Sequence, residues 1–254
     1  MQDILNLPPL PADARIPYGS DPNQFGDLRL PRVKGPHPVV VNIHGGFWRA
    51  RYDLTHAGHL CAALANVGCA TWNLEYRRVG NPGGGWPGSF EDLTQGFLHL
   101  RQIAGEYSLS LERVIVMGHS AGGQLAMVLA AHQPSLRGVV SLAGVLDLRR
   151  AHELRLSNDA VAEFLGGPPE RFGEHYREAD PIALAIPRVP QRLIHGVTDN
   201  IVPIELSRRY RDAKKKTGEA VRLAEVPNAG HFDLIDPRVD AWKKVEEAVK
   251  ELFA

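Results

Sequence analysis

Short apolar runs rich in Val, Ile and Leu alternate along this chain with stretches whose apolar residues recur every three or four positions. The run at 38–43 is short and β-branched, which predicts a strand buried on both faces. A helix is predicted over about 55–67, and Gly68 ends it. The same reasoning predicts strands at 27–33, 69–76, 113–117, 138–142, 191–195 and 220–226, and helices at 89–104, 120–132, 203–216 and from about 238 onward.

This alternation of strands and helices predicts an α/β fold with a mostly parallel central sheet and helices on both faces. The length of 254 residues suits one such domain, spanning 1–254. Between 147 and 188 the periodicity weakens, while Pro and Gly recur. We expect an insertion there that is helical in part and forms a small cap.

The segment 118–122 reads Gly-His-Ser-Ala-Gly and stands between an apolar strand and a helix of small residues. In this setting G-x-S-x-G is typical of a serine nucleophile, because a sharp strand-to-helix turn projects the hydroxyl above the sheet. Glycines flank the serine because a Cβ there would clash with the neighbouring strand and helix. Ser120 is therefore the predicted nucleophile, at a helix N-terminus that favours developing negative charge.

A second glycine segment, His-Gly-Gly-Phe-Trp at 44–48, directly follows the buried strand at 38–43. Attack on a carbonyl creates an oxyanion, which needs backbone N–H donors aimed at it. We therefore predict an oxyanion hole formed by Gly45, Gly46 and Ala121, with Phe47 as a further candidate donor. His44 is expected to support this loop by hydrogen bonding.

The base must be chosen among 11 histidines. His231 follows the last predicted strand, where a loop can reach over the carboxyl edge of the sheet to the serine. Asp199 follows an earlier strand end and is the predicted acid, which would hold the imidazole in the tautomer that accepts the serine proton. Asp147 also follows a strand and is the strongest alternative acid. Asp233 and Asp236 lie too near His231 and are expected to form turns or caps.

The remaining histidines show no pattern typical of metal ligands. His119 and His195 flank strand ends and are expected to be hydrogen-bonded structural residues. Those on predicted helices are expected to lie on helix surfaces or in packing contacts: His56, His59, His99 and His132. Because neither H-E-x-x-H nor C-x-x-C occurs, no metal and no cofactor are predicted.

Composition narrows the choice of partner. Lys plus Arg and Asp plus Glu number 29 each, so the formal net charge is zero. This balance argues against nucleic acid or an anionic membrane and favours a small, largely neutral molecule. Cys61 and Cys69 form no disulfide framework and are expected to be buried thiols. We find no signal-peptide pattern and no apolar run long enough to span a bilayer, so a cytoplasmic location is the default expectation.

Together these segments resemble the α/β-hydrolase superfamily, over roughly 39–231, and are closest to its small esterase-like branches. The order Ser120, Asp199, His231 is the order that this fold uses. The segment at 44–48 resembles both feruloyl- or acetyl-xylan-type esterases and kynurenine formamidases. Segments at 164–167, 180–181 and 195–203 are similar to the esterase branch and to prolyl-oligopeptidase-type catalytic domains. Phe47 departs from hormone-sensitive-lipase-type enzymes, which have a third glycine there.

The resemblance implies a serine hydrolase that cleaves carboxylic esters of small to medium acyl groups through an acyl-enzyme. An amidase such as an arylformamidase acting on N-formylkynurenine shares the same apparatus and stays open. A peptidase is less favoured, since the chain has no room for a propeller, and a catalytically silent binding protein would usually lack one of the three residues. Phe47, Trp48 and Trp86 are predicted to line the substrate pocket, with ordinary packing as the alternative.

Overall fold

The computed structural model describes residues 3–8 and 10–254. Within them, one sheet has the strand order β1-β2-β4-β3-β5-β6-β7-β8, with β1 (Ala14–Pro17), β2 (Phe25–Arg29), β3 (His37–Ile43), β4 (Ala70–Leu74), β5 (Leu109–His119), β6 (Gly138–Leu142), β7 (Gln191–Gly196) and β8 (Val221–Val226). β2 pairs antiparallel with both β1 and β4, and all other neighbours are parallel. The predicted mostly parallel sheet is confirmed.

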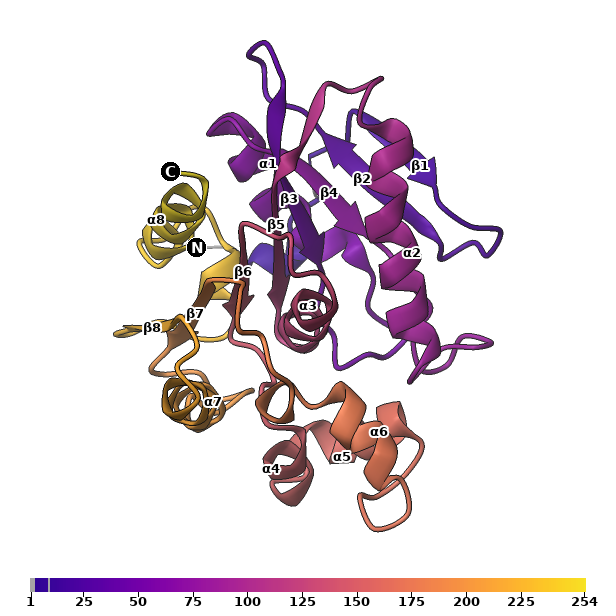
Figure 1. Cartoon of the computed structure of the whole chain (residues 1–254), viewed down its shortest axis with the longest axis vertical. Helices are drawn as coiled ribbons and strands as arrows, with labels where there is room; N and C mark the ends of the chain where they lie inside the picture. Colours follow the sequence, from indigo (N-terminus) through magenta and orange to yellow (C-terminus); the bar gives the residue numbers. More distant parts are fainter. Residues whose placement is uncertain (1–2, 9) are drawn as a thin grey trace.

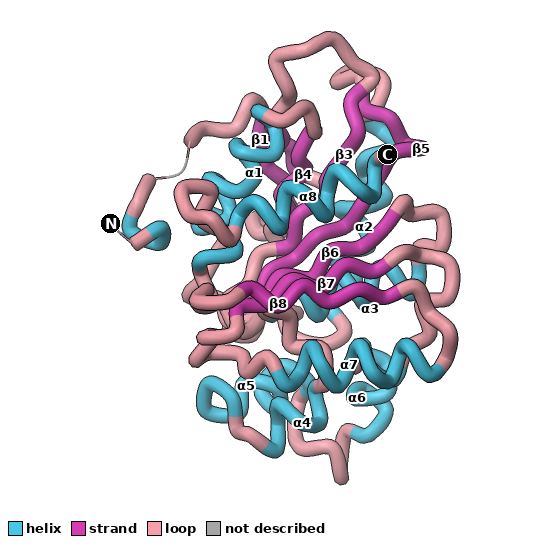
Figure 2. The backbone as a smooth tube through the Cα atoms, turned by 90° about the vertical axis from the view of Figure 1, so that its left-hand side faces the viewer, coloured by secondary structure: helices cyan, strands magenta, loops and turns pink. Residues whose placement is uncertain are grey.

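Helices cover both faces of this sheet (Figure 1; Figure 2). On one face lie α1 (Gly58–Asn66) and α8 (Trp242–Phe253), whose buried side chains form one core cluster. On the other lie α2 (Gly88–Ile103), α3 (Ala121–His132) and α7 (Glu205–Lys216), which contribute to a second cluster. The prediction of helices on both faces is therefore confirmed as well.

Alternation along the central strands separates these two cores. On β3, Val39, Val41 and Ile43 belong to the cluster under α2 and α3, whereas Val40 belongs to the cluster under α1 and α8. Successive side chains of a strand point to opposite faces, so a strand covered on both sides must be apolar throughout. This explains why the sequence of 38–43 lacks the polar alternation of a half-exposed strand.

The elements differ from the predicted ones mainly at their ends. The predicted helix at 55–67 is a 3₁₀ turn, η2 (Leu54–Ala57), followed by α1. β5 begins at Leu109 rather than at 113, because its polar first half pairs with β3 through His37. β1 lies inside the predicted arm and is half-buried, so its sequence carries no continuous apolar run. α8 begins at Trp242 rather than near 238.

Between β6 and β7 the chain forms α4 (Leu148–Glu153), α5 (Leu156–Leu165), α6 (Gly173–Ala179) and the short η3 (Pro181–Ala183). The helices α4, α5 and α6 gather at the bottom of Figure 1, beneath α3 and α7. Their buried side chains, including Val161, Phe164 and Tyr176, join the core cluster under α2 and α3. The insertion therefore shares the core of the sheet. In the described part of the chain, no helix combines the length and apolar character needed to cross a membrane.

Candidate active site

Ser120 occupies the turn between the end of β5 and the start of α3, with φ 56° and ψ −121°. A non-glycine residue at positive φ is strained, and such strain is found at functional turns. The flanking glycines make the turn sterically feasible. A Cβ on Gly118 would collide with the carbonyl oxygen of Gly122, and a Cβ on Gly122 with that of Ile43. The sequence pattern at 118–122 therefore has a direct steric cause.

His231 and Asp199 meet although they lie on separate loops. Asp199 follows β7 and His231 follows β8, and His231 Nδ1 lies 2.7 Å from Asp199 Oδ2. The other carboxylate oxygen of Asp199 accepts from the backbone N–H groups of Ile201 and Val202, both at 2.9 Å. These bonds fix the carboxylate, whose side chain is completely buried. Asp233, in contrast, accepts from the N–H of Gly230 and serves the turn, as expected.

The electrostatics of Asp199 define the tautomer of His231. Burial acts to raise the pKa of Asp199, but hydrogen bonds from His195 and His231 outweigh it and hold this pKa well below its usual range. The carboxylate is therefore ionised at neutral pH and accepts a hydrogen bond from the Nδ1–H group of His231. A neutral His231 ring then has its lone pair on Nε2.

Two further histidines support these loops. His119 Nε2 donates to the backbone oxygen of His231 at 3.0 Å, and the two rings lie 4.5 Å apart. Burial lowers the pKa of His119 well below that of a free imidazole, and the charges of His231 and His56 act in the same direction. His195 Nε2 lies 2.8 Å from the oxygen of Val202. Both rings are buried and hydrogen-bonded, in the structural roles that the sequence suggested.

The glycine loop after β3 packs directly against the serine turn. A Cβ on Gly45 would lie 2.8 Å from the backbone oxygen of His119 and 3.0 Å from Cβ of Ser120, so a glycine suits this close approach. The following backbone is in the left-handed region at Gly46, Phe47 and Trp48, with φ of 111°, 50° and 57°. Within residues 3–8 and 10–254, no protein group accepts from the N–H of Gly46, Phe47 or Ala121.

Hydrogen bonds of the His44 side chain hold the glycine loop at 44–48 in place. Its Nδ1 lies 2.8 Å from the oxygen of Gly45, and its Nε2 lies 2.9 Å from Glu75 Oε1. Glu75 also pairs with the buried Arg78 at 2.7 Å, and the His44 ring stacks on Tyr76 at 4.6 Å. The predicted supporting role of His44 agrees with these contacts.

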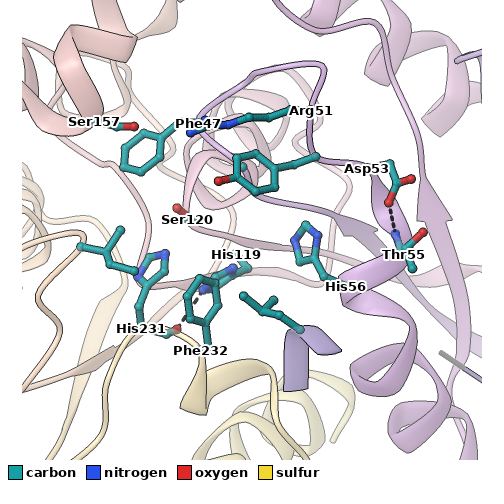
Figure 3. Close-up of a pocket in the computed structure, with 14 residues that line it drawn as sticks. Phe47, Arg51, Asp53, Thr55, His56, His119, Ser120, Ser157, His231 and Phe232 are labelled. Atoms are coloured by element: carbon teal, nitrogen blue, oxygen red, sulfur yellow. Dashed lines mark hydrogen bonds between the residues drawn. The ribbon is translucent and has the colours of Figure 1, made fainter. Parts of the chain in front are cut away.

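Ser120 and His231 open onto the same cavity, which has a volume of about 600 Å³ (Figure 3). Its apolar lining comes mainly from Phe47, Ile201 and Phe232 together with Leu5 of the N-terminal segment. The remaining lining residues are Gly46, Arg51, Tyr52, Asp53, Thr55, His56, His119 and Ser157. The cavity thus combines an apolar part with a polar part.

Several lining residues were not anticipated. His56 was expected on a helix surface or in a packing contact, but it lines the cavity, and burial lowers its pKa to about 4. A neutral imidazole is therefore available there as a hydrogen-bonding group. The sequence offered one indication of this position, since His56 follows the predicted oxyanion loop at 44–48 by only a few residues. Ser157 comes from the insertion, and nothing in its local sequence indicates that it reaches the site.

The prediction for two of the three aromatic residues is corrected. Phe47 lines the cavity, but Trp48 and Trp86 do not. Trp48 is completely buried, stacks on Phe164 at 4.6 Å and donates from Nε1 to Gln124 Oε1 at 2.9 Å. Trp86 is half-buried and lies 3.3 Å from Glu178 of the insertion. Both indoles pack the insertion against the domain, because each faces side chains that the insertion supplies.

We expect Trp48→Ala to lower the free energy of unfolding by about 3–5 kcal/mol, the usual cost of removing a buried aromatic side chain. The shape of the cavity should be unchanged in the protein that remains folded, since the indole does not reach the cavity. Urea unfolding followed by fluorescence measures the free energy of unfolding. The matched control is Trp86→Ala, for which we expect a smaller decrease because Trp86 is only half-buried. Unchanged stability in Trp48→Ala would contradict the assignment of Trp48 to the core.

Similar known structures place this sheet and its covering helices in the α/β-hydrolase fold. A truncated form of a carbohydrate esterase from gut microbiota matches with a TM-score of 0.82 at 19% identity, over 99% of this chain and 98% of that one. Esterase B from Lactobacillus rhamnosis matches with a TM-score of 0.82 at 20% identity, over 94% of this chain and 83% of that one. The chain belongs to the BD-FAE family, whose model matches residues 27–213.

Its relatives carry names of ester and amide hydrolases. Esterase LipQ of Mycobacterium tuberculosis is 27% identical over 91% of this chain and 62% of its own length. Isoprenylcysteine alpha-carbonyl methylesterase ICME of Arabidopsis thaliana is 26% identical over 86% and 56% of the two chains. Kynurenine formamidase of Salmo salar is 23% identical over 89% and 76%. The chain thus spans about three fifths of the length of LipQ.

Proposed function

We propose that this protein is a carboxylic-ester hydrolase that uses Ser120 as nucleophile, His231 as base and Asp199 as the acid that orients it. The observation that carries the proposal is that Ser120, at a strained turn, and His231, held by Asp199 at 2.7 Å, line one cavity. The esterase names of LipQ and ICME support the same class of reaction.

In the proposed reaction, Ser120 Oγ attacks the ester carbonyl while His231 Nε2 takes the hydroxyl proton. Asp199 stabilises the imidazolium that forms, through the bond to Nδ1. His231 then gives the proton to the departing alcohol, which leaves an acyl group on Ser120. Water attacks this acyl-enzyme with His231 again acting as base, and the acid is released.

The oxyanion of each tetrahedral intermediate requires donors that no protein group already occupies. The N–H groups of Gly46 and Ala121 meet this requirement, with Phe47 as a further donor. Ala121 is also the first residue of α3, so the partial positive charge of the helix N-terminus adds to its effect. Gly45 belongs to the same proposed set of donors, and its lack of a Cβ also allows the loop to approach Ser120 closely.

A cavity of about 600 Å³ is of the size that binds small organic molecules. We therefore propose small to medium acyl esters as substrates. The test is a series of 4-nitrophenyl esters from acetate through butyrate to palmitate, with hydrolysis followed by the release of coloured 4-nitrophenolate. Turnover should be highest among the short and medium chains. A protein that turns over none of them, or prefers palmitate, contradicts the proposal.

Because one relative is named as a kynurenine formamidase, the assay should also include a formamide substrate. The same three side chains would cleave a formamide, so the geometry around Ser120 does not separate the two activities. Measuring kcat/KM for N-formylkynurenine beside 4-nitrophenyl butyrate compares them directly. A clear preference for the formamide would replace the esterase proposal with an amidase.

A further inference from the structure

One positive side chain stands within the candidate active site. Among the described residues that line the cavity, Arg51 is the single Lys or Arg. Its guanidinium forms no ion pair of 4.0 Å or less with a carboxylate in the described chain. Figure 3 shows its side chain reaching across the cavity toward Phe47, on the side of Ser120 away from His231.

The guanidinium is held in a way that leaves its donors free. Arg51 Cζ lies 4.8 Å from the centroid of the Tyr52 ring, which also lines the cavity. A cation–π contact engages the face of the guanidinium, whereas its five N–H groups point outward in the plane. These donors match a carboxylate, which can accept two of them at once.

The backbone beneath Arg51 is fixed as well. The N–H of Ala50 donates to the oxygen of Val79 at 2.9 Å, and Arg78 Nη1 donates to the oxygen of Tyr52 at 2.5 Å. Hydrogen bonds on both sides therefore fix the backbone at Arg51, from which its exposed side chain extends. A charge on a fixed loop discriminates between ligands better than one on a mobile loop, because less entropy is lost on binding.

The cavity also contains a carboxylate, Asp53, which could cancel this charge. Asp53 accepts from the N–H of Thr55 at 2.9 Å, and Figure 3 places this pair at the opposite end from Ser120. His56, nearer to Ser120, is neutral because burial lowers its pKa to about 4. The charge that faces the region above Ser120 is therefore positive.

We propose that Arg51 selects esters whose acyl group carries a carboxylate, and that it binds this carboxylate beyond the scissile bond. This inference rests on the proposed esterase function and specifies its substrate class. The acyl group is assigned because the alcohol must leave next to His231, which protonates it. Arg51 lies on the other side of Ser120 (Figure 3), where the retained acyl group is expected.

Two matched substrate pairs test this proposal. Mono-4-nitrophenyl adipate and 4-nitrophenyl hexanoate share acyl length and leaving group but differ in the terminal carboxylate. The pair 4-acetoxybenzoate and methyl 4-acetoxybenzoate instead places the charge on the leaving group. We expect the wild-type protein to favour adipate over hexanoate by about tenfold in kcat/KM, the scale of one charge-assisted bond, with no comparable preference in the second pair.

Variants of Arg51 should change this ratio in a defined order. Arg51→Gln should reduce the adipate preference to about one, and Arg51→Glu should reverse it, since the charge is removed or inverted. Arg51→Lys should keep part of it, because the charge remains without the planar fork. Raising the ionic strength from about 0.02 M to about 0.5 M should weaken the preference in wild type and not in Arg51→Gln. Arg101→Gln, an exposed arginine on α2 outside the cavity, is the matched control.

The outcomes are distinguishable. Equal rates for adipate and hexanoate in wild type, or an adipate preference that survives in Arg51→Gln, overturns the role of Arg51 while the esterase function stands. A larger charge preference in the acetoxybenzoate pair overturns the assignment to the acyl side. If none of the four esters is cleaved, the proposed function is wrong and this inference is lost with it.

Discussion

Ser120→Ala is expected to lower kcat for 4-nitrophenyl butyrate by about 10⁶-fold, the scale of loss when a serine hydrolase loses its nucleophile. The methyl group cannot attack the carbonyl, so the acyl-enzyme does not form. The fold should be kept, because alanine removes only the hydroxyl from a turn whose geometry depends on the flanking glycines. Steady-state hydrolysis measures the loss of turnover, and labelling with a fluorophosphonate probe measures the loss of the reactive serine.

The matched control is Ser135→Ala, an exposed serine between α3 and β6. It should retain wild-type rates and full labelling by the probe. Peptide mapping of the labelled wild-type protein should place the adduct on Ser120. Substantial activity in Ser120→Ala, or an adduct at another serine, would show that the nucleophile lies elsewhere.

Asp199→Asn is expected to lower kcat/KM by about 10⁴-fold, the loss known for this substitution in serine-protease triads. An amide in this position offers its NH₂ group to Nδ1, so the ring turns to the tautomer with the proton on Nε2. Such a ring cannot accept the proton of Ser120. The depressed pKa of Asp199 also implies that its ionisation does not shape the activity profile near neutral pH.

Asp147→Asn provides the control, since Asp147 was the strongest alternative acid in the sequence. Its carboxylate accepts from the N–H of Arg150 at 2.9 Å and from Arg209 at 2.7 Å, so it caps α4 and ties it to α7. We expect a modest loss of stability and near-normal kcat/KM. A loss of activity greater in Asp147→Asn than in Asp199→Asn would exchange the two roles.

Local sequence was enough to define the sheet and the serine turn. The run at 38–43 has to be buried on both faces, since no other environment suits six residues with so little polar alternation. The glycines at 118 and 122 are likewise explained by contacts within a few ångströms of Ser120. Parallel strands then bring their carboxyl ends to one edge, which is why loops after β5, β7 and β8 could be expected to meet.

Other features depended on partners that are remote in sequence. The local pattern around Trp48 suits a pocket wall as well as a core position, and the choice was made by Gln124, 76 residues away, together with Phe164. In the same way, the path of the insertion brings Ser157 to the cavity that Arg51, 106 residues earlier in the chain, also lines.

The sequence by itself determined the fold class and the strained turn that presents Ser120, because both follow from short-range sterics and hydrophobic periodicity. Only the tertiary structure decided which aromatic side chains are core, which residues surround the serine and which charge faces it. The burial of a side chain and the charges around Ser120 depend on contacts contributed by several chain segments, so no single segment of the sequence determines them.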